Sequence, residues 1–251
     1  MFLAGFDLPM QYLDLNCDLG EGGAQDAELM PLVSSANIAC GAHAGDVATM
    51  RATVALAQRH GVAVGAHPGF ADREHFGRRE LRLTATELIR LVRGQIEALQ
   101  ALGPVRHVKP HGGLYNLAAR DADTARAVAV AVREADPSLV LFGLAGGELL
   151  RAGRALGLRV VSEVFADRAY QPDGTLAPRG MPGALLGVDL AVAQVLGIVR
   201  TGAVRTTDGS LVPVQADTVC VHGDGPEAVE LARALRETLR RAGVTLRAFS
   251  G

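Results

Sequence analysis

Short apolar segments alternate with longer amphipathic segments along almost the whole chain. The short segments are rich in strand-forming residues and predict seven buried strands, at residues 12–16, 36–40, 62–66, 105–109, 139–144, 158–165 and 218–222. Residues 244–249 are a candidate eighth strand. Apolar residues at helical spacing predict helices over residues 46–60, 84–102, 121–135, 146–156, 188–200 and 226–242.

This alternation predicts a parallel sheet whose faces are covered by helices. Seven or eight such units favour an α/β fold of the (β/α) barrel type, and no G-x-G-x-x-G follows the first strand to indicate a dinucleotide-binding sheet. We see no linker or repeat, so we expect one barrel domain over residues 1–251. Two irregular segments, 167–183 and 204–214, are expected to cover the barrel mouth, the second as a hairpin with its turn at Asp208 and Gly209.

The alternation of side chains within the strands predicts a polar lumen. Asp14, Asn16 and Asp18 share one face of the first strand, while apolar residues occupy the other face. Helices cover the outside of a parallel barrel, so the polar face should point inward. The same rule places further ionisable groups in the lumen: His67, His107, Lys109, His111 and His222. Burial of so many such groups is costly unless they are paired or functional, which indicates a site at the carboxyl ends of the strands.

Four histidines stand beside glycines where predicted strands end. A single histidine in such a place is more often a core residue, but four together favour a functional site: His43, His67, His111 and His222. Lys109 is the only lysine of the chain and lies in the motif K-P-H-G-G. Its structural alternative is an ion pair with Asp14 or Asp18.

Composition narrows the class of partner. The net charge of −2 gives no basic field for nucleic acid, so a small-molecule substrate is expected. The apolar runs are too short to span a membrane and the first residues do not resemble a signal peptide, so we expect a cytoplasmic protein without a membrane partner. Three cysteines without C-x-x-C spacing indicate neither a disulfide framework nor a cysteine zinc site.

The strand-end motifs, in their order, resemble the LamB/YcsF family. They span nearly the whole chain and include D-L-N-C-D-L-G-E, S-S-A-N-I-A-C-G-A-H-A-G-D, G-A-H-P-G-F, H-V-K-P-H-G-G-L-Y-N, E-V-F-A-D-R-A-Y-Q-P-D-G-T-L and V-C-V-H-G-D. The resemblance implies a barrel of the glycoside hydrolase/deacetylase type. It also implies ATP-coupled opening of 5-oxoproline to glutamate, with ATP and Mg²⁺ as co-substrate and with partner subunits B and C.

This chemistry suggests roles for the polar residues. Lys109 is the candidate cation for the developing oxyanion, and His67 or His111, with Asp18, is the candidate proton carrier. Arg79 or Arg168 is the candidate for holding the substrate carboxylate. The full set of candidate substrate-binding residues is Asn16, Glu21, His43, Asp46, Arg79, Asp167, Arg168, His222 and Asp224.

Two other functions remain open at this stage. The main hypothesis expects no resident metal. A metal-dependent amidase or deacetylase would use Asp18, His43 and His67 as ligands, with His111 as a further candidate. A non-catalytic binding protein is the third hypothesis.

Overall fold

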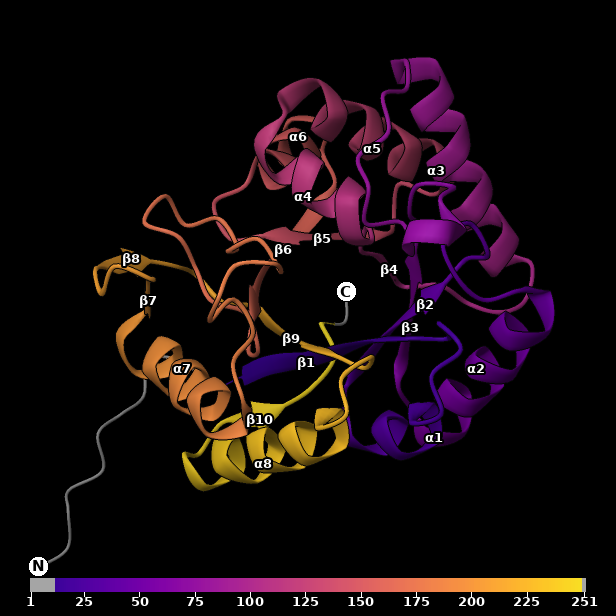
Figure 1. Cartoon of the computed structure of the whole chain (residues 1–251). Coiled ribbons are helices and arrows are strands. Elements are labelled where there is room, and N and C mark those ends of the chain that lie inside the picture. Colours follow the sequence, from indigo (N-terminus) through magenta and orange to yellow (C-terminus); the bar gives the residue numbers. More distant parts are fainter. Residues whose placement is uncertain (1–11, 250–251) are drawn as a thin grey trace, which may run out of the picture.

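The computed structural model describes residues 12–249, in which seven parallel strands close into a barrel (Figure 1). In order around the barrel they are β1 (Tyr12–Leu19), β2 (Ser35–Ala39), β3 (Ala63–His67), β4 (His107–Val108), β5 (Val140–Leu144), β6 (Arg159–Phe165) and β9 (Thr218–His222). Closure comes from β9, which pairs in parallel with both β6 and β1. The predicted barrel is therefore confirmed. The candidate eighth strand is only β10 (Thr245–Leu246), which pairs with the first two residues of β1.

The predicted helices surround this barrel as α2 (Val47–His60), α3 (Ala85–Gln100), α5 (Ala122–Ala135), α6 (Glu148–Ala155), α7 (Val188–Thr201) and α8 (Ala228–Arg241). Local signals explain their ends: Thr84 and Glu87 form a capping box at α3, and left-handed Gly61 ends α2. Four short helices were not predicted: α1 (Asp26–Leu29), η1 (Met30–Leu32), η2 (Arg73–His75) and α4 (Gly112–Arg120). No helix in the described part of the chain is long and apolar enough to cross a membrane.

The two irregular segments differ in position. Residues 176–179 of the first contribute to the lining of the barrel mouth, as predicted. The second forms the antiparallel hairpin of β7 (Ala203–Arg205) and β8 (Leu211–Pro213), with Gly209 left-handed in its turn. The prediction that this hairpin covers the mouth is wrong, because it follows α7 rather than a barrel strand and lies at the outer edge (Figure 1). There the Thr207 N–H donates to the Tyr170 carbonyl at 2.8 Å, which braces the first segment.

The lumen is polar, as the alternation predicts, and its groups form one connected network. The Thr218 hydroxyl donates to Asp14 at 2.6 Å and accepts from the Asn16 amide at 2.8 Å. Asn16 also donates to Glu163 at 2.9 Å and accepts from Asn37 at 2.7 Å. Every step joins two different strands, so these hydrogen bonds fix the register of the barrel as well as satisfying its buried polar groups.

His107 has a structural place in this network, as its position near the start of its strand predicts. Its Nε2 lies 2.8 Å from the Asn37 Oδ1, its ring stacks on Phe142, and burial lowers its pKa to about 3, so it is neutral. The ring occupies the space above Gly65, where a Cβ would meet the His107 Nε2 at 2.0 Å. Only glycine fits there without displacing the ring.

We expect Gly65→Ala to lower the free energy of unfolding by about 1–3 kcal/mol, because the His107 ring must move and lose its bond to Asn37. Urea denaturation measures this. Gly94→Ala is the matched control, since Gly94 lies in α3 with no atom within 4 Å of the added Cβ. It should leave stability unchanged or raise it by up to about 1 kcal/mol. Equal stabilities of the two variants would contradict this account of the lumen.

Candidate active site

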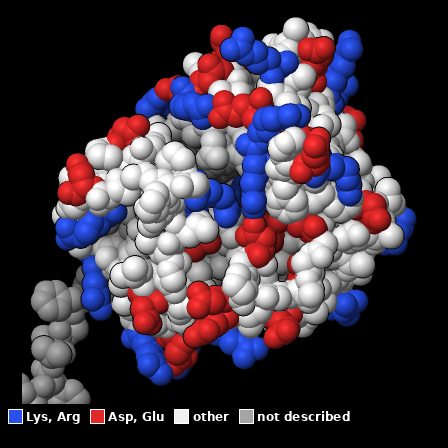
Figure 2. Space-filling model, viewed as in Figure 1, with Lys and Arg blue, Asp and Glu red and all other residues white. Residues whose placement is uncertain are grey.

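A cavity of about 220 Å³ opens at the carboxyl ends of the barrel strands. Its lining combines acidic, imidazole and basic groups, namely Asp18, Glu21, His67, Arg78, Lys109, His111, Arg168, Arg179, His222 and Asp224. Figure 2 shows the hollow on this face, with basic and acidic side chains around it. The C-terminal end is where (β/α) barrels assemble their active sites.

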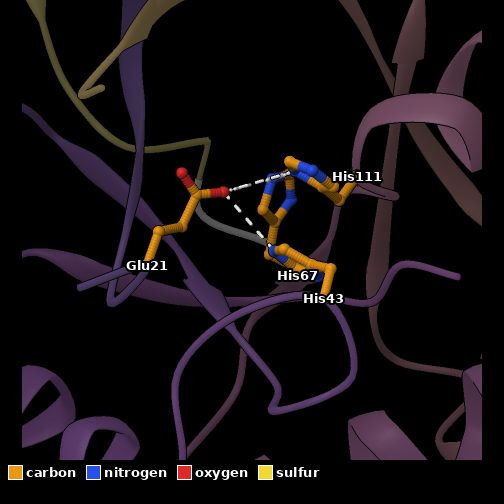
Figure 3. A group of neighbouring side chains, drawn as sticks. All are labelled: Glu21, His43, His67 and His111. Carbon is orange, nitrogen blue, oxygen red and sulfur yellow. Dashed lines mark hydrogen bonds and ion pairs between the residues drawn. The ribbon is translucent and has the colours of Figure 1, made fainter. Parts of the chain in front are cut away.

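One end of the cavity holds a cluster of Glu21 and three histidines, which point toward one another (Figure 3). The Glu21 Oε1 lies 3.3 Å from the His111 Nδ1, 3.4 Å from the His43 Nε2 and 3.8 Å from the His67 Nε2. Each of the four residues lies at the end of a different strand. Glu21, His43 and His111 follow β1, β2 and β4, and His67 is the last residue of β3. Adjacent strand ends therefore bring together residues that are up to 90 positions apart in the sequence.

Backbone carbonyls fix the orientation of two imidazole rings. The His67 Nδ1 lies 2.7 Å from the Lys109 carbonyl, and the His111 Nε2 lies 2.8 Å from the Phe76 carbonyl. A carbonyl only accepts, so each of these nitrogens carries a hydrogen. The other nitrogens, His67 Nε2 and His111 Nδ1, face each other at 3.0 Å beside the Glu21 carboxylate.

Beneath this cluster Lys109 lies buried between two carboxylates. Its Nζ is 2.9 Å from the Asp18 Oδ1 and 3.0 Å from the Glu163 Oε1. It also lies 3.2 Å from the Asn16 Oδ1 and 2.9 Å from the Cys220 Sγ, so its three N–H groups are fully engaged. In the structural role considered from the sequence, Lys109 would form an ion pair with Asp14 or Asp18. The structure shows Asp18 and Glu163, whereas Asp14 bonds to hydroxyl groups.

The charges of the cluster shift several pKa values. Burial opposes ionisation of Asp18, but His67 and Lys109 outweigh it and hold the pKa of Asp18 well below its usual range. Burial likewise disfavours the His67 imidazolium, but nearby Asp18 raises the pKa of His67. Burial lowers the pKa of His43 to about 4. Burial also disfavours ionised Glu21, but contacts with His111 and His43 lower its pKa to about 2. The two carboxylates are therefore ionised at neutral pH.

The cavity also brings together a second group of predicted residues, with His222 beside Asp18. The His222 Nδ1 lies 2.9 Å from the Asp167 carboxylate, which orients the ring. Asp224 pairs with Arg78 across the mouth. Arg168 is buried, with one guanidinium N–H donating to the Ala177 carbonyl and its Nε without a partner in the described structure.

Two predicted binding residues, Asp46 and Arg79, lie outside the cavity lining. Asp46 is exposed and caps α2, accepting from the Thr49 N–H at 2.8 Å, which is the ordinary role of an aspartate before a helix. Arg79 is exposed and lies 3.4 Å from Asp72, outside the cavity lining. Its neighbour Arg78 lines the mouth instead. The metal ligands expected for an amidase or deacetylase also differ from those predicted. In the structure, Glu21 rather than Asp18 groups with the three histidines.

Sequence reasoning missed Asn37, Glu163, Phe76 and Arg78. A signal existed for Glu163, because it is the one acidic residue in the otherwise apolar second half of β6. Asn37 stands on the same face of β2 as Ser35, so the alternation used for β1 would have placed it in the lumen. Phe76 and Arg78 lie in a loop, where no periodicity indicates direction.

The parallel barrel and its charged cavity define the class of protein, an α/β-barrel enzyme with catalytic-type side chains at the carboxyl ends of its strands. The chain belongs to the LamB/YcsF family, whose sequence profile matches residues 13–251.

Individual relatives agree with this assignment. The A subunit of 5-oxoprolinase from Bordetella pertussis is 52% identical over 247 residues, which cover 94% of this chain and 98% of that protein. The crystal structure of the lactam utilization protein from Thermus thermophilus superposes with a TM-score of 0.88 at 48% identity, covering 95% of this chain and all of that one. A family 4 carbohydrate esterase from Streptomyces lividans, at 13% identity and a TM-score of 0.51 over 97% of this chain and 94% of its own, shares the fold alone.

We expect Lys109→Met to destabilise the protein by about 3–5 kcal/mol, because the carboxylates of Asp18 and Glu163 would remain buried without their shared cation. Thermal and urea unfolding measure this loss. Adding Glu163→Gln to that variant removes one uncompensated charge and should restore part of the stability. If the single variant is as stable as the parent, or the double variant is less stable than the single, the ion network does not hold the lumen together.

Proposed function

We propose that this chain is the A subunit of an ATP-dependent 5-oxoprolinase, which opens 5-oxoproline (pyroglutamate) to L-glutamate. The observation that carries the proposal is the cavity, whose lining combines carboxylate, imidazole and guanidinium groups. Its volume of about 220 Å³ suits a small metabolite better than a polymer. The names of the relatives that are 52% identical over most of the chain support the same substrate.

The charges suggest how 5-oxoproline would lie. Its carboxylate is assigned to Arg78 and Arg168, whose guanidinium groups line the cavity. Its lactam carbonyl is then directed toward Lys109 and the carboxylate and imidazole groups. Lys109 would act mainly through its charge, because its N–H groups already face Asp18, Glu163 and Cys220.

A lactam is a stable amide, so its hydrolysis needs activation. Transfer of a phosphoryl group from ATP to the carbonyl oxygen would turn it into an electrophile that water attacks. Asp18 offers a carboxylate that can accept the proton of that water and pass it to the ring nitrogen as the carbon–nitrogen bond breaks. Breaking that bond leaves an acyl phosphate on the opened chain, which a second water hydrolyses to give glutamate and inorganic phosphate.

Nucleotide and partners belong to the same proposal. ATP, with Mg²⁺, is the co-substrate, and 5-oxoprolinase subunits B and C are the partners. We place nucleotide binding outside this cavity, because the chain has no G-x-x-x-x-G-K-[ST] loop and the cavity is small for a nucleotide. A cytoplasmic location stays a prediction. The second candidate is an ATP-independent amidase or deacetylase, which the histidine-rich cluster favours.

We expect the purified chain alone to convert little 5-oxoproline, and the rate to rise at least about 100-fold when subunits B and C and ATP are added. Glutamate formation and ADP release in matched reactions measure this. A full rate without ATP or partners would favour the amidase. No gain from the partners would reject the assignment to a 5-oxoprolinase complex.

We expect Arg78→Ala to raise KM for 5-oxoproline about 10- to 100-fold in the reconstituted enzyme, because a charge-assisted bond to the carboxylate contributes about 1.5–3 kcal/mol. The kcat should change much less. Arg79→Ala is the matched control, since it removes an arginine one residue away that lies outside the cavity lining. Equal KM values for both variants would show that the carboxylate lies elsewhere, with Arg168 the next residue to test.

A further inference from the structure

The cluster of Glu21, His43, His67 and His111 has more electron-pair donors than protons to share between them. The N–H groups of His67 and His111 that point away from the centre are used by the carbonyls of Lys109 and Phe76. Neutral rings in these orientations turn two lone pairs toward each other at 3.0 Å, beside an oxygen of a carboxylate. Such an arrangement is repulsive unless a cation lies between them.

His43 strengthens this point. It is 1% exposed, and neither of its ring nitrogens has a hydrogen-bond partner in the described structure; the Glu21 Oε1 that it faces has none either. Buried imidazole nitrogens are normally satisfied. The His43 ring also stacks on that of His111, with ring centroids 3.8 Å apart and an angle of 2° between the planes. In the stacked pair, the His43 Nε2 lies 3.4 Å and the His111 Nδ1 lies 3.3 Å from the same oxygen of Glu21.

The spacing of the four atoms fits one ion. Zinc-to-ligand distances of about 2.0–2.1 Å place the ligands of a tetrahedral site about 3.3 Å from one another. Four of the six separations run from 3.0 to 3.8 Å, and the other two are at most 4.8 Å. The carbonyls behind His67 and His111 resemble the outer hydrogen bonds that orient metal-binding histidines.

Formal charge supports a divalent cation. The three carboxylates of Asp18, Glu21 and Glu163 lie in or directly beneath the cluster, and the ammonium of Lys109 balances only one of them. Two negative charges remain when the imidazoles are neutral. Burial of such an excess is costly without a counter-ion.

We propose that Glu21, His43, His67 and His111 bind one divalent transition-metal ion, of which Zn²⁺ is the best match. Three imidazole nitrogens and one carboxylate suit Zn²⁺, Co²⁺ or Fe²⁺ and do not suit Mg²⁺, which prefers oxygen ligands, so this site is distinct from that of the Mg²⁺ carried by ATP. Glu21, His67 and His111 line the cavity, which leaves one side of the ion accessible to a small molecule. By taking a fifth ligand on its accessible side, a bound ion would supply Lewis-acid polarisation of a carbonyl or a more acidic water.

The test is metal binding itself and requires no turnover. Protein stripped with a chelator is titrated with Co²⁺, followed by visible absorption, and with Zn²⁺, followed by calorimetry and competition against Co²⁺. We expect one equivalent of each metal and the strong visible bands of four-coordinate Co²⁺. His43→Ala and Glu21→Gln should weaken binding by about 100-fold or more, since even outer-shell changes cost 10- to 100-fold. His60→Ala is the matched control and should bind as the parent does, because His60 is an exposed histidine at the end of α2.

Two results would overturn the proposal. The first is no stoichiometric binding by the parent, which would mean that a shared proton, rather than a metal, joins His67 to its neighbours. The second is equal binding by the parent and Glu21→Gln, a change at the cavity edge that keeps the side-chain volume. Circular dichroism checks that both variants fold. The outcome is independent of the proposed lactam substrate, so loss of one conclusion leaves the other standing.

Discussion

The buried ammonium of Lys109 is the interaction on which the rest of the lumen depends. It lies between Asp18 of β1 and Glu163 of β6, and it also contacts Cys220 of β9. Opposite sides of the barrel are thus joined through one side chain. Because this shared cation offsets part of the charge of Asp18 and Glu163, the strand ends can carry acidic groups at a depth where barrels usually carry Val, Ile and Leu.

Two aspartates of one strand show how local this effect is. Asp14 and Asp18 share the lumen face of β1, four residues apart. Burial raises the pKa of Asp14 to about 6, despite hydrogen bonds from Ser34, Thr218 and Ser35. Asp18 is buried as well, but His67 and Lys109 lie beside it and its pKa falls well below its usual range. Burial is common to both, so the cations in reach account for the opposite directions. The charged end of the lumen is therefore the mouth, where the candidate active site lies.

Period-two alternation was sufficient to predict the polar lumen and to place Asp18, His67 and Lys109 in it, because side-chain direction within a strand follows from parity alone. The glycine-flanked histidines likewise indicated the carboxyl ends of the strands. Parity does not give distances across a barrel, so the pairing of Lys109 with Glu163 was not predictable. Side-chain positions in loops are harder to predict than those in strands. Asp46 and Arg79 have residue types that are common in binding sites, yet Asp46 caps a helix and Arg79 lies outside the cavity lining. The direction of a side chain in an irregular loop depends on backbone angles that no repeating pattern reveals.

The loop after β3 shows what backbone strain contributes to the site. Phe76 is the one non-glycine residue with a positive φ among residues 12–249, at 54°, and Gly77 follows with a φ of 61°. Such a conformation costs a phenylalanine about 1–3 kcal/mol and persists only where the surroundings impose it. Here it aims the Phe76 carbonyl at the His111 Nε2 and sets the phenyl ring edge-on against His43 and His111. A Cβ at residue 77 would lie 2.7 Å from that of His43, so the close approach requires glycine. Phe76 and Gly77 therefore hold the imidazoles of His43 and His111 in fixed orientations. The contacts that orient these rings offset the cost of the strained backbone.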